Sequence, residues 1–202
     1  MSAHAASAAA GLHAIVLAAG ASTRFGSPKQ LVRIGDRPLL NAAVGCASEV
    51  VGQSVLVVLG AHAAELTPLL KHSAATVVIN RQWREGLGSS IRAGIARLPP
   101  SCTGALLLLA DQAAVSAEDL RRLADAWKRH PEGIAAAVHG TTVGAPAIFP
   151  GFLFPELAEL KGDVGARVLL KRYAARLTRV PMSSAAFDLD TPEDLLSLEV
   201  RK

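Results

Sequence analysis

The sequence is poor in aromatic residues and cysteine, and it contains no long hydrophobic run. Aromatic side chains make up 4% of the 202 residues, too few for the stacking surface that single-stranded nucleic acid binders use. The two cysteines, Cys46 and Cys102, lie far apart without a CxxC pair, which argues against a secreted disulfide scaffold. No apolar run approaches the ~18 residues needed to cross a bilayer. These absences favour a globular protein with neither nucleic acid nor a membrane as its partner.

A strong charge of one sign is also missing, because 21 basic residues are nearly balanced by 17 acidic ones. The net charge of +4 is scattered, without a run of five basic residues, and favours small anionic ligands over duplex nucleic acid. The Ala-rich residues 1–11 have neither Lys nor Arg and make a poor signal peptide. We expect a disordered tail over residues 1–12, a single domain over residues 13–202, and a cytoplasmic location.

The most informative stretch runs from residue 14 to residue 31. Residues 14–17 form a short apolar run, typical of a strand that is buried on both faces. Residues 18–26 are almost free of bulk, so their backbone N–H groups can approach an anion closely. Arg24 and Lys29 add two cations. This pattern predicts a polyphosphate-binding loop, and the alternative is a small-residue turn with solvated cations.

Two familiar phosphate-binding fingerprints do not fit this loop. A dinucleotide fingerprint needs G-x-G-x-x-G, but the next glycine after Gly20 is Gly26. A P-loop needs four residues between its glycines and a lysine directly after the second one. Here five residues intervene, and Ser27 and Pro28 precede Lys29.

Strand-like and helix-like segments alternate along the chain. The predicted strands cover residues 14–17, 55–59, 76–79, 104–110 and 134–138, and the predicted helices cover residues 39–47, 63–71, 88–98, 117–129 and 152–161. Residues 142–149 contain Pro146, so that strand would be an edge strand or irregular. The alternation predicts an α/β fold with a mostly parallel sheet and helices on both faces, in three Rossmann-like layers.

Two serines open the helix predicted from residue 88. Ser89 and Ser90 follow a glycine, which is ordinary capping chemistry, and they could equally present donors to a nucleotide. Asn80 follows the third predicted strand. Trp83 lies in the loop between them and could cover a flat ring or simply hold the loop.

Three aspartates are candidate metal ligands. Asp111 follows the clearest buried strand, at the edge where open α/β sheets bind ligands, and Ser116 already caps the next helix. Asp188 and Asp190 alternate by two, so in an extended segment their side chains face the same way and would repel each other without a cation. The alternatives are that Asp111 is a turn or cap residue, and that one of the other two caps the following helix while its neighbour is solvated.

The pattern L-A-A-G-x-S-x-R-x-G-x-x-K-x-L, matched from residue 17 to residue 31, resembles the molybdenum cofactor cytidylyltransferases among the MobA-like NTP transferases. Four further blocks follow in that family's order. Related guanylyltransferases typically have Leu-Ala-Gly-Gly, so Ala19 implies CTP rather than GTP. Two positions depart from the family pattern: Ala113 replaces a common proline, and Leu189 replaces the usual isoleucine.

The resemblance implies a nucleotide-diphosphate transferase fold and a role for each matched residue. The residues expected to bind nucleotide are Leu17, Ala18, Ala19, Gly20, Ser22, Arg24, Lys29, Asn80, Ser89, Ser90 and Asp111. Those expected to bind the acceptor are Gly144, Pro146, Gly162, Asp163, Gly165 and Ala166. The expected catalytic residues are Arg24, Lys29 and Asp111, and the expected ligands of Mg²⁺ are Asp111, Asp188 and Asp190.

The activity expected from this combination is transfer of CMP from CTP to molybdenum-carrying molybdopterin, with release of pyrophosphate. A molybdenum hydroxylase that receives the product is a further candidate partner. Two alternatives remain open. One is a transferase of the same fold that uses GTP or acts on a sugar or alditol phosphate. The other is a non-catalytic carrier or chaperone of the cofactor, which would have no need to hold Mg²⁺ and a triphosphate.

Overall fold

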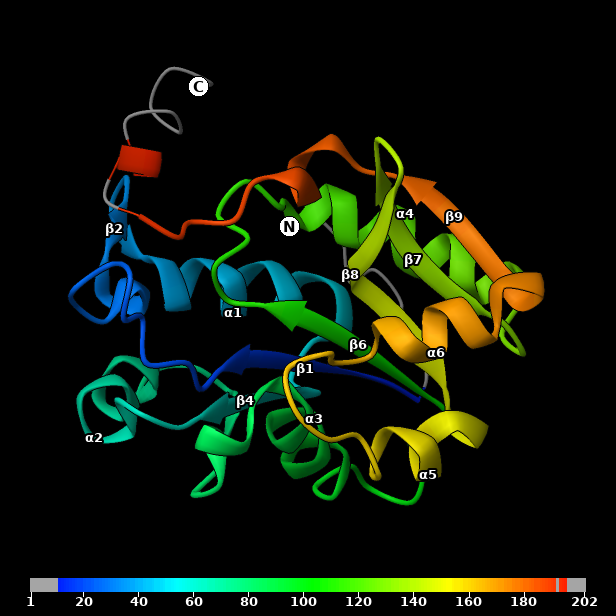
Figure 1. The fold of residues 1–202 in the computed structure, drawn as a ribbon, viewed down its shortest axis with the longest axis horizontal. Helices are drawn as coiled ribbons and strands as arrows, with labels where there is room; N and C mark the ends of the chain where they lie inside the picture. Colours follow the sequence, from blue (N-terminus) through cyan, green and yellow to red (C-terminus); the bar gives the residue numbers. More distant parts are fainter. Residues whose placement is uncertain (1–10, 192, 196–202) are drawn as a thin grey trace, which may run out of the picture.

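The computed structural model describes residues 11–191 and 193–195, and its centre is a seven-stranded sheet. The strands lie in the order β5-β4-β1-β6-β8-β7-β9, and β1 runs through the middle of the molecule (Figure 1). β1 pairs in parallel with β4 on one side and with β6 on the other. A small hairpin of β2 and β3 forms a second sheet.

The bounds of the elements are as follows. The strands are β1 (Leu12–Ala18), β2 (Arg33–Ile34), β3 (Arg37–Pro38), β4 (Val55–Leu59), β5 (Thr76–Ile79), β6 (Gly104–Leu109), β7 (Ile134–His139), β8 (Thr142–Pro150) and β9 (Leu177–Pro181). The α-helices are α1 (Leu39–Val51), α2 (Ala63–Leu66), α3 (Leu87–Ile95), α4 (Ala117–Arg129), α5 (Phe154–Leu157) and α6 (Arg167–Arg172). The 3-10 helices are η1 (Lys29–Leu31), η2 (Thr67–Leu70), η3 (Trp83–Glu85), η4 (Gly151–Leu153), η5 (Ala174–Arg176) and η6 (Ser183–Ala186).

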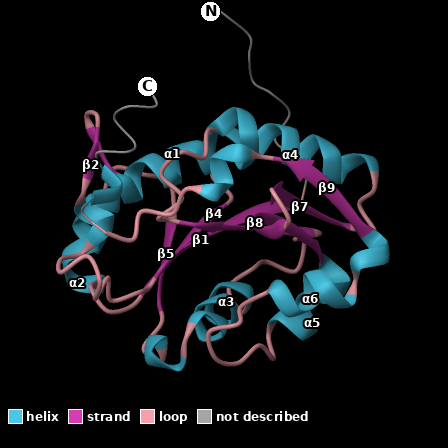
Figure 2. Ribbon diagram, turned by 45° about the horizontal axis from the view of Figure 1, so that its top comes forward, coloured by secondary structure: helices cyan, strands magenta, loops and turns pink. Residues whose placement is uncertain are grey.

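The sheet separates two hydrophobic cores. Along β1, Ala14 and Val16 face a core that includes α1 and α4, whereas Ile15 and Leu17 face a core that includes α3, α5 and α6. Figure 2 shows these two groups of helices on opposite sides of the strands. Strands buried on both faces are continuously apolar, and all five residues of β4 are buried. The predicted α/β fold, with a mostly parallel sheet and helices on both faces, is confirmed.

The expectation that the strand with Pro146 lies at an edge is wrong. β8 lies between β6 and β7 and is antiparallel to both. Its pairing with β7 shifts register between Ala136 and Ala137, opposite residues 145 and 146. A proline cannot donate a ladder hydrogen bond, and a bulge leaves its residues unpaired, so the proline is accommodated inside the sheet. The expected irregularity is therefore present.

Several predicted helices are shorter than expected. The helix predicted over residues 63–71 is α2 followed by η2, with Pro68 at the junction, because proline cannot continue the helical ladder. The helix predicted over residues 152–161 is reduced to η4 and the four residues of α5. The helix predicted over 88–98 ends at Ile95. Within residues 11–191 and 193–195, no helix has the length and apolar character that a membrane span requires.

Three boundaries also differ from expectation. β1 begins at Leu12, which the expected tail included, because Leu12 pairs with Gly104 and is 1% exposed. The expected connection over residues 32–37 contains β2 and the start of β3, and β9 was not expected at all. Near the C-terminus, the carboxylate of Asp194 accepts hydrogen bonds from the backbone of Asp190 and Thr191. Pro192 and residues 1–10 lie outside the described residues.

Helix α4 begins with a reciprocal cap that gives a testable stability effect. The Ser116 hydroxyl accepts from the Asp119 backbone, and the Asp119 carboxylate accepts from the Ser116 backbone, from Ser184 Oγ and from Arg122. Burial acts to raise the pKa of Asp119, but these hydrogen bonds outweigh it and lower the pKa. Replacing Asp119 with alanine should destabilise the fold by about 1–2 kcal/mol, a fall in Tm of ~3–6 °C by calorimetry.

The lowered pKa of Asp119 also sets the direction of the pH dependence. The carboxylate stabilises the fold fully above its ordinary pKa of about 3.9, and this stabilisation is lost as the pH falls through the lower folded value. The difference between wild type and variant should therefore be constant near pH 7 and shrink below about pH 4. As a control, Asp125→Ala on the same helix removes only an exposed pair with Lys128 and should cost less than about 0.5 kcal/mol. Equal effects of the two substitutions would contradict this account.

Candidate active site

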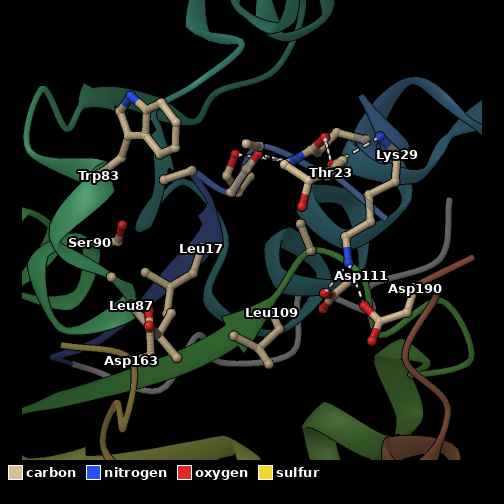
Figure 3. A pocket seen from close by; sticks show the side chains of 18 of the residues that line it. Leu17, Thr23, Lys29, Trp83, Leu87, Ser90, Leu109, Asp111, Asp163 and Asp190 are labelled. Atoms are coloured by element: carbon tan, nitrogen blue, oxygen red, sulfur yellow. Dashed lines mark hydrogen bonds and ion pairs between the residues drawn. The ribbon is translucent and has the colours of Figure 1, made fainter. Parts of the chain in front are cut away.

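A cavity of about 410 Å³ opens at the carboxyl ends of β1 and β6, where open α/β sheets bind ligands. Its wall combines the loop after β1, the start of η1, the segment that leads into α3, and the end of β6. The lining residues used below are Leu17, Ala18, Ala19, Gly20, Ser22, Arg24, Lys29, Gln30, Trp83, Leu87, Ser90, Asp111, Asp163 and Asp190. In Figure 3, Lys29, Asp111 and Asp190 meet at one end, and Trp83, Ser90, Leu87 and Asp163 lie at the other.

The small-residue loop is held from behind by a buried glutamine. Gln30 is 3% exposed, and its Nε2 donates to the carbonyls of Ala18 and Gly20 at 3.3 and 3.4 Å. Its Oε1 accepts from Ser22 Oγ, which in turn accepts from the backbone N–H of Lys29. The sequence prediction gave Gln30 no role, although it lies beside Lys29. Its amide fixes the curvature of the loop and leaves the loop's other face to the cavity.

One lysine joins the acidic residues from two distant parts of the chain. Lys29 Nζ lies 2.7 Å from Asp111 Oδ2 and 3.1 Å from Asp190 Oδ1. Arg24 Nη2 lies 3.0 Å from Asp190 Oδ2. Burial acts to lower the pKa of Lys29, but the two carboxylates outweigh it and raise the pKa, so the ammonium is fully charged at neutral pH.

The third predicted metal ligand, Asp188, lines a neighbouring cavity instead. Burial raises the pKa of Asp188, and the charges of Asp111 and Asp190 raise it further. Within the described part of the chain, no three His, Cys, Asp or Glu side chains form a ready metal cluster. Asp111 Oδ1, however, is buried and has no hydrogen-bond partner among the described residues. Two carboxylates with spare acceptor capacity fit a hard cation that takes its other ligands from phosphates and water, as Mg²⁺ does.

The serine pair at the start of α3 is mostly occupied by structural hydrogen bonds. Asn80 is 5% exposed and donates to Ser89 Oγ and Ser90 Oγ at 2.8 and 3.0 Å. Ser89 Oγ lies within hydrogen-bond distance of the Gln82 and Gly86 carbonyls. Ser90 lines the cavity, whereas Asn80 and Ser89 do not appear in its wall. Asn80 and Ser89 therefore support the loop that contains Trp83.

A second cavity of about 770 Å³ shares part of its wall with the first. The shared residues are Leu17, Leu87, Leu109 and Asp163. The rest of the second wall is apolar where it meets β6 and β8, and it has Arg167 and Lys171 from α6 as its cations. The two cavities are thus adjacent compartments that share one wall.

The residues predicted to bind the acceptor divide into two groups. Gly144, Asp163 and Ala166 line the second cavity. Gly162 packs against the start of α3, where its carbonyl accepts from Gly88 N at 2.9 Å. Pro146 and Gly165 are absent from the walls of both compartments. Gly165 has a φ of +57°, and a Cβ there would lie 2.7 Å from Leu87 Cδ2, so this position needs glycine for the turn and for close packing.

Gln112 is a further residue in the second wall to which sequence reasoning gave no role. It is 7% exposed, and its Nε2 lies 2.9 Å from the Ala145 carbonyl and 3.4 Å from the Ala185 carbonyl. Because carbonyls can only accept, the amide orientation is determined. Its Oε1 is then an acceptor without a partner in the described structure. This contact joins residues that lie 33 positions apart in the sequence, so only the tertiary structure reveals it.

Gly60 controls the distance between the loop and Trp83. A Cβ at Gly60 would lie 2.6 Å from the Ala19 carbonyl oxygen and 2.7 Å from Trp83 Cβ. Gly60→Ala should therefore move the loop and weaken the nucleotide binding that the sequence predicts for it on the order of tenfold, measured by calorimetric titration with Mg-CTP. Gly45→Ala in α1 is the control, because its nearest contact is 3.9 Å away, and it should leave binding unchanged. Wild-type affinity in Gly60→Ala would show that the loop tolerates displacement.

Comparison with known proteins agrees with this architecture. The chain is 30% identical over 201 residues to nicotine blue oxidoreductase of Paenarthrobacter nicotinovorans, covering 91% of this chain and 94% of that protein. The crystal structure of Rv0371c from Mycobacterium tuberculosis H37Rv superposes with a TM-score of 0.80 at 31% identity, over 94% of this chain and 97% of that one. A manganese complex of Rv0371c superposes with a TM-score of 0.76 at 28% identity, over the same shares of the two chains.

The family assignment rests on the part of the chain that supplies most of the lining of both compartments. Residues 14–177 match the MobA-like NTP transferase domain. The matched region includes the loop after β1, Lys29, Asp111 and the segment that contains Asp163. The chain therefore belongs to the family of MobA-like NTP transferase domains, and it is a nucleotidyltransferase-family enzyme.

Proposed function

We propose that this protein transfers CMP from CTP to molybdenum-carrying molybdopterin in a Mg²⁺-dependent reaction that releases pyrophosphate. The observation that carries the proposal is the shared wall of the two compartments, formed by Leu17, Leu87, Leu109 and Asp163. A transferase must hold two substrates in contact. One compartment offers a small-residue loop with cations, and the other offers an apolar wall with cations of its own.

The choice of CTP rests on the loop. Ala18, Ala19 and Gly20 line the first cavity and carry almost no side chain, so the nucleotide would be recognised mainly by main-chain contacts. The sequence Leu-Ala-Ala-Gly at residues 17–20 resembles the cytidylyltransferases, whereas the related guanylyltransferases carry a glycine at the position of Ala19.

The reaction needs positioning and charge neutralisation more than covalent help. The acceptor phosphate attacks the α-phosphorus of CTP, the bond to the β-phosphate oxygen breaks, and pyrophosphate leaves with the bonding electron pair. Arg24 and Lys29 would bind the β- and γ-phosphates and stabilise the leaving group. Bound Mg²⁺, held by Asp111 with Asp190 or Asp188, would supply further neutralisation of the phosphate charge. No general base is needed, because a phosphate nucleophile is already ionised.

The second compartment is proposed to hold the acceptor. Its apolar strands suit a planar ring system, and Arg167 and Lys171, four residues apart on one helical face, suit a phosphate. The same wall contains Gly144 and Ala166, whose small side chains leave room for the ligand. It also contains Asp163, whose carboxylate adds a hydrogen-bond acceptor.

Arg167→Ala should change the kinetics of the acceptor without changing the binding of CTP. Loss of one cation from the acceptor wall should raise the KM for molybdopterin about tenfold to a hundredfold, with the CTP affinity unchanged. The matched control is Arg172→Ala on the same helix, because Arg172 pairs with Glu156 and is 60% exposed. Steady-state kinetics with each substrate varied in turn would check this. An equal rise in the KM for CTP would contradict the assignment of the compartments.

The test of the proposed function begins with nucleotide binding. Thermal unfolding would be followed with CTP, GTP, ATP and UTP, each with and without Mg²⁺. A ligand at about 100 times its Kd adds ~2.7 kcal/mol, which should raise Tm by about 5–10 °C. A selective shift with Mg-CTP, followed by release of pyrophosphate in the presence of molybdopterin, would support the proposal. A larger shift with Mg-GTP would overturn the base assignment. Turnover only with a sugar or alditol phosphate would overturn the acceptor.

A second candidate follows from the relative named as an oxidoreductase. Its 30% identity extends over 91% of this chain, so redox chemistry in the same cavities is the specific rival to phosphoryl chemistry. The discriminating measurement is the same thermal series with NADPH and NADH added. A shift with a nicotinamide cofactor and none with any Mg-nucleotide would favour the rival. No shift with either class would favour a non-catalytic carrier of the cofactor.

A further inference from the structure

Among residues 11–191 and 193–195, no carboxylate oxygen at the acidic end of the first cavity is both exposed and free of an ion pair. Asp111 Oδ2 and Asp190 Oδ1 bind Lys29 Nζ at 2.7 and 3.1 Å, and Asp190 Oδ2 binds Arg24 at 3.0 Å. The fourth oxygen, Asp111 Oδ1, is buried. Figure 3 shows the Lys29 side chain reaching across to both carboxylates. A divalent cation that binds Asp111 and Asp190 must therefore take the place of an ammonium group.

The ammonium also belongs to the segment that would bind the triphosphate. The backbone N–H of Lys29 donates to Ser22 Oγ in the small-residue loop, and Gln30 holds the same loop from behind. The Lys29 side chain is 14% exposed, and its ammonium group is carried by four flexible methylene groups. A small rotation would exchange the carboxylates for phosphate oxygens without moving the backbone.

We propose that Lys29 acts as an internal counter-ion that competes with the divalent metal for Asp111 and Asp190. In the nucleotide-free protein the lysine holds the two carboxylates together and excludes free metal ions. Triphosphate attracts the ammonium away, and the metal then binds between the carboxylates and the phosphates. This inference rests on the proposed function in one respect, namely that a nucleoside triphosphate binds in the first cavity.

Because of this competition, the affinity for the metal depends on whether the nucleotide is bound, and the affinity for the nucleotide depends on whether the metal is bound. A ligand that removes Lys29 from the carboxylates raises the metal affinity, and the metal must raise the affinity for that ligand by the same factor. The lysine thus has two successive anionic partners. It pairs with the acidic residues before the nucleotide binds and with the phosphates afterwards. It prevents the protein from trapping metal without substrate.

The test is the affinity for Mn²⁺ alone, measured by electron paramagnetic resonance of the free ion, without nucleotide. Lys29→Met keeps the length of the side chain and removes its charge. Lys29→Met should bind Mn²⁺ on the order of tenfold more tightly than the wild type. Lys29→Gln provides a second neutral variant if the methionine variant is unstable, and circular dichroism checks that each is folded.

Two variants serve as controls. Lys29→Arg retains the cation and should show no tightening. Arg24→Met removes a cation whose side chain is 74% exposed, and it should change the Mn²⁺ affinity by no more than about twofold. Adding CTP should tighten Mn²⁺ binding in the wild type more than in Lys29→Met, because the neutral variant has no ammonium to displace.

Each outcome decides the proposal. Tighter Mn²⁺ binding in the neutral variants but not in Lys29→Arg would support it. Unchanged or weaker binding in the neutral variants, equal tightening in Lys29→Arg, or no Mn²⁺ binding by any variant would overturn it. Failure of the proposed activity can be told apart from failure of this inference. Tighter Mn²⁺ binding without CTP turnover would contradict the activity and leave the inference standing. Turnover without tighter Mn²⁺ binding would overturn this inference alone.

Discussion

Replacing Asp111 with asparagine is expected to lower the rate of pyrophosphate release by about 10²–10³-fold or more. The side chain follows β6 at the carboxyl edge of the sheet, and it offers both an oxygen bound to Lys29 and a buried oxygen without a described partner. Asparagine keeps the shape and one acceptor but removes the charge that a divalent cation needs. The measurement is single-turnover pyrophosphate release at saturating Mg²⁺, CTP and acceptor.

The fold should survive this substitution. The pair with Lys29 is largely buried, with side chains 14% and 23% exposed, but Lys29 still binds Asp190 and asparagine still offers it an acceptor oxygen, so the substitution should cost about 1–3 kcal/mol. Asp125→Asn, at an exposed position on α4, is the matched control and should retain full activity. A rate for Asp111→Asn within about fivefold of wild type would exclude a role in metal binding.

Replacing Lys29 with methionine is expected to reduce turnover by about 10²–10³-fold, although the same variant should bind metal more tightly. The reason is that Lys29 would contact the β- and γ-phosphates in the reacting complex, where negative charge develops on the leaving pyrophosphate. Tighter binding of the metal does not replace the positive charge that the Lys29 ammonium would supply at the leaving pyrophosphate. The measurement is kcat with Mg-CTP, at concentrations that saturate both substrates.

Charge and length can be separated at this position. Lys29→Arg should recover more activity than Lys29→Met, because its guanidinium still supplies a cation and donors to phosphate. Loss of Lys29 also leaves Asp111 without its ion pair and Asp190 with only the exposed Arg24, so the stability of the methionine variant should rise when Mg²⁺ is added. Wild-type kcat in Lys29→Met would remove this lysine from the reaction.

Most strands of the main sheet, the order of the main elements and the position of a cavity after β1 could be predicted from the sequence, because each depends on local patterns, whereas β2, β3 and β9 were missed. An apolar run such as residues 55–59 is a buried strand wherever it pairs, and a run of small residues after a strand exposes its backbone. Asp111 and Lys29 were expected in one site, and the structure brings their side chains to 2.7 Å. Their roles in metal and phosphate binding stay predictions for the experiments above.

Proline and helix lengths show where local patterns were insufficient. Pro146 argued for an edge strand, yet β8 is internal because a register shift in β7 leaves residues 145 and 146 unpaired. The sequence contains the proline but not the partner strand that accommodates it. Residues 152–161 have an apolar spacing that suits a helix, but only Phe154–Leu157 is an α-helix.

The sequence by itself determined the fold class, the small-residue loop after β1 and the broad family of MobA-like NTP transferase domains, since these depend on residue order within short segments. Only the tertiary structure decided which side chains share a wall. It assigned Gln30 to the back of the loop, Asn80 and Ser89 to the support of the Trp83 segment, and Asp188 to the second compartment. It also brought Lys29 between two aspartates that lie 82 and 161 residues away along the chain. Contacts between groups so far apart in the sequence depend on the order in which the strands pair in the sheet. A local sequence pattern does not determine that order.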